Sequence, residues 1–277
     1  MKTILVPTDF SDNSRNAFRY SLELAKISAA KVVLFHVIQI IVSPVPDMPV
    51  VVTPSEEELE REGRQRLTAF ANEARNESAN GIEIEYNISI GSVTDKIFEL
   101  IREKKIDLIV MGISGTNLLR EMLIGSNTVK LIREASCPVL AVPPEAKFKK
   151  LQTIVFACDY KKNSNDAALD TIKEFVNLFN SKLHIINISK PAAIPTTEQV
   201  GTSVHLEHQL KEINPTVYFP EQDDVVEGIN EFVEEYHADM LVMIPRRHSL
   251  LEIIFSKSNT KKMAFHTHIP LLAVHEN

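Results

Sequence analysis

Three of the eight glycines in this chain lie close together and could form a phosphate-binding loop. Gly112 and Gly115 follow an apolar run typical of a strand, and Gly125 stands just before Ser126. The first two glycines allow a sharp turn and let a ligand approach the bare main chain. The segment starting at Gly125 is predicted to open a helix, whose free N–H groups and dipole would attract an anion.

The spacing Gly-x2-Gly-x9-Gly-Ser belongs neither to a P-loop, which requires Gly-Lys-Ser/Thr, nor to a dinucleotide fingerprint. In the anion-binding interpretation, the hydroxyls of Ser126 and Thr128 add hydrogen bonds to the ligand. A plainer interpretation is that the glycines only make a tight turn and that Ser126 is the N-cap of the helix. The loop alone leaves both open.

The elements that position this loop occur twice in the chain. Residues 93–142 align without a gap with residues 225–274, and 17 of the 50 pairs are identical, whereas chance identity is about one in sixteen. The identical pairs include Asp107/Asp239, Met111/Met243, Ser126/Ser258, Asn127/Asn259, Thr128/Thr260 and Pro138/Pro270. With a different offset, Asp9 aligns with Asp159. We therefore expect two copies of one domain, residues 1–146 and 147–277, joined by a short proline-led, charged linker.

Each copy is expected to alternate strands and helices. Strand-like runs in the first copy are residues 4–6, 32–35, 82–84, 108–110 and 139–142. Several are continuously apolar, which suits strands covered on both faces of a parallel sheet. Phe18, Leu22 and Ala25 recur at helical spacing, and Ser55 with Glu58 predicts a capping box. The pattern indicates an α/β protein with two doubly wound parallel sheets.

Taken together, the motifs resemble the universal stress protein family. The glycine pattern matches the family's ATP-binding signature, and Pro7-Thr8-Asp9 after the first strand, His36-Val37-Ile38 and Cys137-Pro138-Val139 fit as well. The resemblance covers nearly the whole chain and implies a tandem universal stress protein. It further implies five-stranded domains of the adenine nucleotide alpha hydrolase-like type with strand order 3-2-1-4-5. In that order the ligand crevice lies at the carboxyl ends of strands 1 and 4.

The resemblance also implies the ligand, ATP with or without Mg²⁺, and its contacts. The expected binding residues are Pro7, Thr8, Asp9, Val37, Met111, Gly112, Gly115, Gly125, Ser126, Asn127 and Thr128. Asp9 would contact ribose or adenine, the Val37 main chain would meet the adenine edge, and the glycine loop would hold the phosphates. Asp9 could instead be the N-cap of the first helix, which does not exclude ligand contact. No catalytic or metal-ligating residue is expected, and His36 is expected to be structural.

The second copy has lost the loop. Ile244, Arg247 and Lys257 stand where the first copy has its three glycines. Side chains would fill the space for phosphate, and a positive φ would be costly for them, so this copy is not expected to bind ATP in the family's manner. The basic cluster of Arg246, Arg247 and Lys257 is either a solvated face or a site for an anion or acidic partner. His205 and His208 are interpreted as surface histidines rather than metal ligands.

We expect nucleotide binding coupled to a stress or energy-state response. The alternatives are a slow ATPase and a nucleotide-free protein-interaction module. The apolar final strands, 139–142 and 271–274, are expected to pair and form a pseudo-dimer, and homodimerisation or an unidentified protein partner is compatible with this. Residues 43–49 would form a lid or pack on the partner domain.

The bulk composition limits the other classes of partner. The net charge of −7 and two halves without basic excess disfavour nucleic acid as a partner. Two cysteines suit a reducing compartment, and the short apolar runs predict neither a signal peptide nor a membrane span, so a cytoplasmic protein is expected.

Overall fold

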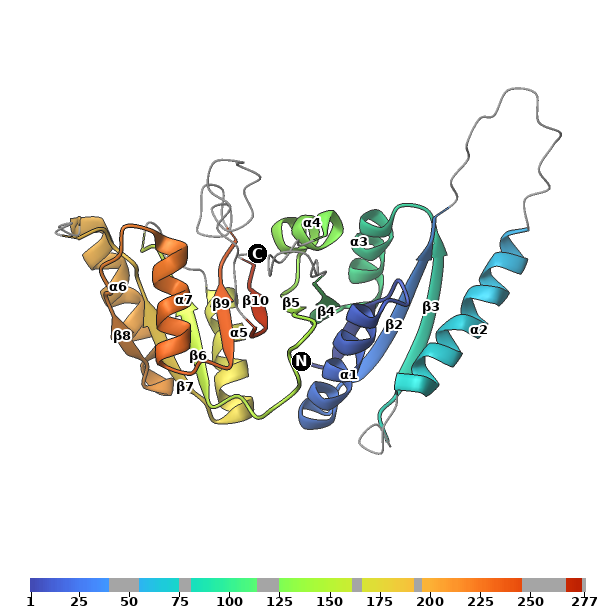
Figure 1. Cartoon of the computed structure of the whole chain (residues 1–277), viewed down its shortest axis with the longest axis horizontal. Coiled ribbons are helices and arrows are strands. Elements are labelled where there is room, and N and C mark those ends of the chain that lie inside the picture. The colour runs from blue at the N-terminus through green and yellow to red at the C-terminus, as the bar shows by residue number, and fades with distance from the viewer. Residues whose placement is uncertain are drawn as a thin grey trace, which may run out of the picture. The chain divides into compact units, whose positions relative to one another are not determined.

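The computed structural model of the chain describes residues 1–39, 55–74, 81–113, 125–160, 166–191, 196–245 and 268–275 (Figure 1). It divides into two compact units, Met1–Met111 and Gly112–Asn277. The segment 43–49, which we interpreted as a lid or a packing element, lies outside the described residues.

The first unit is a parallel sheet with helices between its strands. Its elements are β1 (Thr3–Pro7), α1 (Asp12–Ser28), β2 (Lys31–Ile38), α2 (Glu56–Ala74), β3 (Ile84–Ile90), α3 (Val93–Lys104) and β4 (Leu108–Gly112). The strand β1 pairs in parallel with both β2 and β4, and β2 pairs in parallel with β3. This gives the order 3-2-1-4, as the family resemblance implies. Residues 4–6 are fully buried, which explains their continuous apolarity.

Local hydrogen bonds close two of the helix ends in this unit. At the start of α2, Glu58 N–H donates to the Ser55 hydroxyl over 3.2 Å, and Ser55 N–H donates to the Glu58 carboxylate over 3.0 Å. This reciprocal pair is the predicted capping box. The helix α1 ends at Ala29 in the left-handed conformation, with the Ala30 N–H bonded to the Ala25 carbonyl.

One strand prediction was wrong in position. The expected third strand covered residues 82–84, but β3 begins at Ile84 and continues to Ile90. All seven of its residues are only half-buried, and all seven pair with β2. The segment Ile84–Ile90 alternates polar and apolar residues, as a half-buried strand does, and the predicted residues 82–84 reach only its first position.

The second unit contains the end of the first copy and the whole second copy. Its elements are α4 (Ser126–Glu134), β5 (Val139–Val142), β6 (Thr153–Ala157), α5 (Asp166–Phe179), β7 (Lys182–Ile186), α6 (Thr197–Leu210), a short 3-10 helix (Lys211–Ile213), β8 (Thr216–Tyr218), α7 (Val225–Glu235), β9 (Met240–Met243) and β10 (Leu271–Ala273). Parallel pairs join β6 to β7 and β9, β7 to β8, and β9 to β10. The order β8-β7-β6-β9-β10 is therefore 3-2-1-4-5, which confirms the predicted fold.

The final strands of the two copies pair with each other. The strand β10 runs antiparallel to β5, with Leu272 opposite Leu140. Since β5 bonds to a strand of the second copy, it belongs to the second compact unit, although the repeat assigns it to the first copy. The domain boundary near residue 146 stays a prediction from the repeat.

In both copies, an aspartate just before the fourth strand accepts two main-chain hydrogen bonds from the start of the first strand. In the first, the Asp107 carboxylate accepts hydrogen bonds from the N–H groups of Lys2 and Thr3 over 2.6 and 2.9 Å. In the second, Asp239 accepts from Gln152 and Thr153 over 2.6 and 3.0 Å. This duplicated geometry shows that the sequence repeat is a structural repeat.

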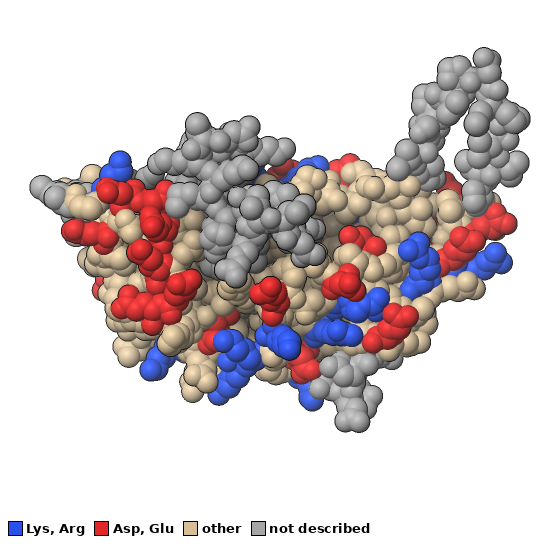
Figure 2. All heavy atoms as spheres, in the orientation of Figure 1, with Lys and Arg blue, Asp and Glu red and all other residues tan. Residues whose placement is uncertain are grey.

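Charge on the surface is unevenly distributed. On the face shown in Figure 2, acidic side chains gather over α7, which exposes Glu227, Glu231, Glu234 and Glu235. Such a face repels the phosphate backbone of nucleic acids. Across the described part of the chain, no helix is both long and apolar enough to cross a membrane.

Candidate functional site

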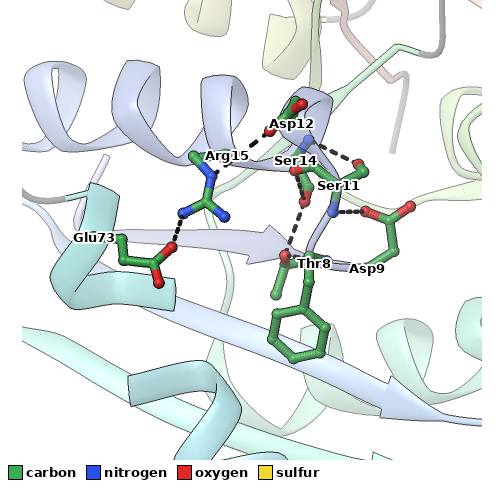
Figure 3. Close-up of polar contacts among 8 residues, drawn as sticks. Thr8, Asp9, Ser11, Asp12, Ser14, Arg15 and Glu73 are labelled. Atoms are coloured by element: carbon green, nitrogen blue, oxygen red, sulfur yellow. Dashed lines mark hydrogen bonds and ion pairs between the residues drawn. The ribbon is translucent and has the colours of Figure 1, made fainter. Parts of the chain in front are cut away.

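The turn after β1 carries the first group of predicted site residues (Figure 3). Pro7 ends the strand, and Thr8 is buried with its N–H bonded to the Phe35 carbonyl over 2.8 Å. The Thr8 hydroxyl pairs with that of Ser14 over 2.9 Å and accepts the Phe10 N–H over 3.0 Å. Thr8 therefore anchors the turn from inside, while the neighbouring Asp9 is exposed.

Asp9 is not the N-cap of α1. That position is held by Ser11, whose hydroxyl accepts the Ser14 N–H over 3.2 Å. The Asp9 carboxylate instead accepts the Ser11 N–H over 3.0 Å and so closes a turn ahead of the helix. Partial burial raises the pKa of Asp9, but hydrogen bonds from Ser11 and Ser14 outweigh it and hold that pKa below its usual value. Asp9 is thus an exposed, ionised acceptor at the carboxyl end of β1.

Phe10 holds the outer side of this turn, a role that our sequence reasoning missed. Its φ of 67° is in the left-handed region, which is costly for an aromatic residue. The ring lies 4.4 Å from that of His36 and 5.7 Å from that of Phe70, and the Arg66 guanidinium covers it at 4.3 Å. The available sequence signal was that an aromatic residue follows the aspartate in both copies, Phe10 in the first and Tyr160 in the second, and Tyr160 also has a positive φ, of 49°.

The end of β2 supplies His36 and Val37. The His36 Nδ1 lies 2.8 Å from the Thr8 carbonyl oxygen, and because a carbonyl only accepts, the ring must donate. This contact gives His36 the structural role that we expected. Burial lowers the pKa of His36, and the bond to Thr8 offsets this only in part. Val37 is buried and aligned with Ser89 of β3.

The last residues of β4 lead into the glycine loop. Met111 is 8% exposed and Gly112 is half-buried. The next residue, Ile113, donates its N–H to the Val142 carbonyl at the end of β5 over 3.0 Å. Gly115 lies outside the described residues.

The start of α4 carries the remaining predicted residues. Gly125, not Ser126, is the N-cap, and its carbonyl accepts the first helical bond from Val129 over 3.1 Å. A glycine cap has no side chain to bond the first helical N–H groups, and no side chain among the described residues caps them instead. Ser126 and Asn127 are exposed there, while Thr128 is 4% exposed. The structure therefore rejects Ser126 as the N-cap and leaves a helix start without a side-chain cap.

Comparison with known proteins identifies the fold's relatives. Residues 1–143 and 150–275 each match the model of the universal stress protein family. This chain belongs to that family. It carries two of its domains in tandem, since each match spans a whole copy of the repeat.

Individual proteins similar to this chain are known from sequence and from structure. The chain is similar to a universal stress protein of Methanocaldococcus jannaschii, MJ0531, with 34% identity over 153 residues, covering 53% of this chain and 84% of that one. A universal stress protein of Archaeoglobus fulgidus has a similar solved structure, with a TM-score of 0.72, 19% identity, and coverage of 99% of this chain and 98% of that one. A universal stress protein solved in complex with cAMP matches 51% of this chain and 96% of its own length, at 27% identity and a TM-score of 0.38.

The loop glycines that the structure describes in this universal stress protein do not have a left-handed backbone. We expected positive φ angles at the loop glycines, but Gly125 has a φ of −58°, and among the described glycines only Gly81 and Gly91 have positive values. The backbone at Gly112 and Gly125 is therefore open to any residue. In the second copy, Ile244, at the position of Gly112, is buried, with 8% of its surface exposed.

Other predicted features of the second copy are only partly described. Arg247, Lys257 and the rest of the basic cluster lie outside the described residues, as do Ser258 to Thr260. His205 and His208 are exposed on α6. Over the described ranges, no group of three or more His, Cys, Asp or Glu side chains could hold a metal ion.

Proposed function

We propose that this tandem universal stress protein binds ATP through its first copy, and that bound nucleotide sets its conformation or its affinity for a protein partner during stress or energy depletion. The main supporting observation is the start of α4, where the N-cap is Gly125, no side chain of the described residues caps the helix, and Ser126 and Asn127 are exposed. We propose that the protein works in the cytoplasm, where ATP is available.

The phosphate end of the ligand suits α4. Helix N-termini attract anions because the free N–H groups and the macrodipole act together. Among the described residues, the atom nearest to a Cβ placed on Gly125 is the Thr128 hydroxyl oxygen, at 3.9 Å. In the proposal, Gly112, Gly115 and the amides of Ser126 and Asn127 hold the phosphates, with Thr128 as a supporting hydroxyl.

The turn after β1 suits the sugar. Asp9 is exposed and its lowered pKa keeps it ionised at neutral pH, so it accepts hydrogen bonds from hydroxyl groups. The family resemblance gives Asp9 the ribose, and the main chain of Val37 the adenine edge. Pro7, Thr8 and Met111 shape the surroundings of these groups. ATP would enter with or without Mg²⁺.

The second copy differs from the first at the proposed phosphate-binding position. Ile244, which aligns with Gly112, has a buried side chain where the first copy has none. We propose that this copy binds no ATP in the family's manner and serves the protein through its pairing with the first copy. Homodimerisation of the pseudo-dimer and an unidentified protein partner remain part of the proposal.

The test is to denature freshly purified protein and identify the released nucleotide. We expect ATP close to one per chain, and none from Gly115→Arg, which introduces the second copy's own residue. The matched control is the reverse exchange, Arg247→Gly, which should release as much as the parent. Equal release from the parent and Gly115→Arg would overturn the site assignment.

Two further readouts separate the alternatives. Steady ATP turnover that disappears in Gly115→Arg would favour a slow ATPase. Protein that carries no nucleotide and whose melting temperature is unchanged by added ATP would favour an interaction module, because a ligand that binds the folded state must stabilise it.

A further inference from the structure

The strand pair β5–β10 connects the second copy to the predicted phosphate-binding segment. Ala273 lies opposite Val139, and the chain continues past Val274 to His275. The region α4–β5 belongs to the first copy, whereas β10 and His275 belong to the second. A residue of the copy without an intact loop is thereby brought to the helix that begins at the loop's end.

His275 caps the far end of that helix. Its Nε2 lies 2.8 Å from the carbonyl oxygen of Ile132, and since the carbonyl only accepts, the imidazole donates. Ile132 is in the last turn of α4, where carbonyl groups have no helical partner. Both residues are buried, with His275 9% and Ile132 0% exposed. A buried carbonyl without a donor there would be destabilising, so the imidazole satisfies a real requirement.

Two further bonds hold the same segment. The Ala135 N–H donates to the Leu131 carbonyl over 3.0 Å and closes the end of α4. The Ile113 N–H donates to the Val142 carbonyl over 3.0 Å, which attaches the residue after Gly112 to β5. The residue after Gly112 is thus bonded to β5, the strand that pairs with β10, and α4 is closed by its own main chain next to the carbonyl that His275 caps.

We propose that His275 is a positioning residue for the nucleotide site. By capping the C-terminal end of α4, it fixes the direction in which the helix's N-terminal amides point, so the second copy sets the affinity of the first for polyphosphate. This inference rests on the proposed ATP site. The first copy has Pro143 at the position equivalent to His275, and a proline side chain cannot donate the corresponding hydrogen bond.

The experiment compares ATP binding by calorimetry for the parent, His275→Ala, His275→Gln and His268→Ala. We expect His275→Ala to weaken ATP binding by about three- to tenfold, the range of one neutral hydrogen bond. The side-chain amide introduced by His275→Gln can donate at a reach similar to that of Nε2, so this variant should bind within about twofold of the parent. His268, an exposed histidine near the start of β10 with 75% side-chain exposure, is the matched control, and its replacement should leave affinity unchanged.

A second readout does not need nucleotide. Hydrogen exchange of the α4 amides without ATP should speed up in His275→Ala, and recover in His275→Gln, while exchange in α1 stays as in the parent. If the parent binds no ATP but α4 shows this pattern, the proposed function fails and the cap stands. If the parent binds ATP and His275→Ala binds it equally well, the inference is overturned.

Discussion

Leu272 pairs directly opposite Leu140, which is its own counterpart in the sequence repeat. The neighbouring pairs, Leu271 with Ala141 and Ala273 with Val139, are likewise exchanged by the repeat. Two equal strands meeting in this way form an isologous contact of the kind found in twofold dimers. It also covers two apolar strand edges that would otherwise invite aggregation. The predicted pairing of the final strands is confirmed.

Because the contact between β5 and β10 is self-complementary, truncating either of its two central leucines should lower stability by a similar amount. Both Leu140 and Leu272 are fully buried. We expect Leu140→Ala and Leu272→Ala each to lower the free energy of unfolding by about 2–5 kcal/mol, measured by urea denaturation. Val200→Ala, at a residue that is 51% exposed, should change it by less than about 0.5 kcal/mol. A large cost at only one leucine would contradict the symmetry.

The two equivalent aspartates, Asp107 and Asp239, are expected to stabilise the fold by different amounts. Asp239 is 5% exposed and also pairs with Lys149 at 2.5 Å, whereas Asp107 is exposed. Removing Asp239 leaves two main-chain donors without their acceptor in a more buried place. We expect Asp239→Ala to cost about 2–4 kcal/mol and Asp107→Ala about 1 kcal/mol in chemical denaturation. An equal loss of stability in the two variants would show that burial does not change what these aspartates contribute.

The buried histidine at the end of α4 predicts a loss of stability in mild acid. Burial lowers the pKa of His275 from 6.5, and main-chain contacts with Ile132 and Cys137 offset this only in part. A pKa that is lower in the folded than in the unfolded state contributes stability above pH 6.5, and this contribution is lost as the pH falls through the folded-state value. The melting temperature should therefore fall between about pH 7.5 and about pH 5.5. His275→Gln should flatten this dependence, and an unchanged slope would argue against a neutral buried imidazole.

The packing of the Phe10 ring is expected to stabilise the turn that contains Asp9. Phe10→Ala removes the contacts with His36, Phe70 and Arg66, and we expect it to cost about 1–3 kcal/mol in thermal denaturation. Phe10→Tyr introduces the residue that the second copy uses at this place and should cost less than about 1 kcal/mol. If ATP binds as proposed, only the alanine variant should weaken it. Equal stability of the two variants would show that the ring is not needed.

An ion network outside the site gives a further test of electrostatics. Hydrogen bonds from Asn87 and Lys104 lower the pKa of Glu85 to about 2. Its stabilising contribution is present above the unfolded-state pKa and lost as the pH falls toward 2. Because Glu85 is one-third exposed, Glu85→Gln should cost only about 0.5–1 kcal/mol at neutral pH in urea denaturation. A loss that does not shrink in high salt would point to packing instead.

Much of the architecture follows from the sequence because its signals are local. Continuous apolar runs such as residues 4–6 require burial on both faces, and Ser55 with Glu58 marks a helix start within one turn. The repeat located the second domain without any structural information. Local signals were less accurate at caps, where Ser11 and Gly125 hold the positions for which Asp9 and Ser126 were the candidates. Several polar residues in a row can each cap a helix, and only the path of the chain selects one.

The sequence by itself determined the two-copy α/β organisation and the loss of the glycines in the second copy, because both are properties of residue type and spacing. Tertiary structure alone decided the Phe10 stack and the cap that His275 places on Ile132, 143 positions away. Contacts of that kind depend on which strand edges meet and in which register. That is settled by packing of the whole unit, since no short stretch of sequence contains both partners.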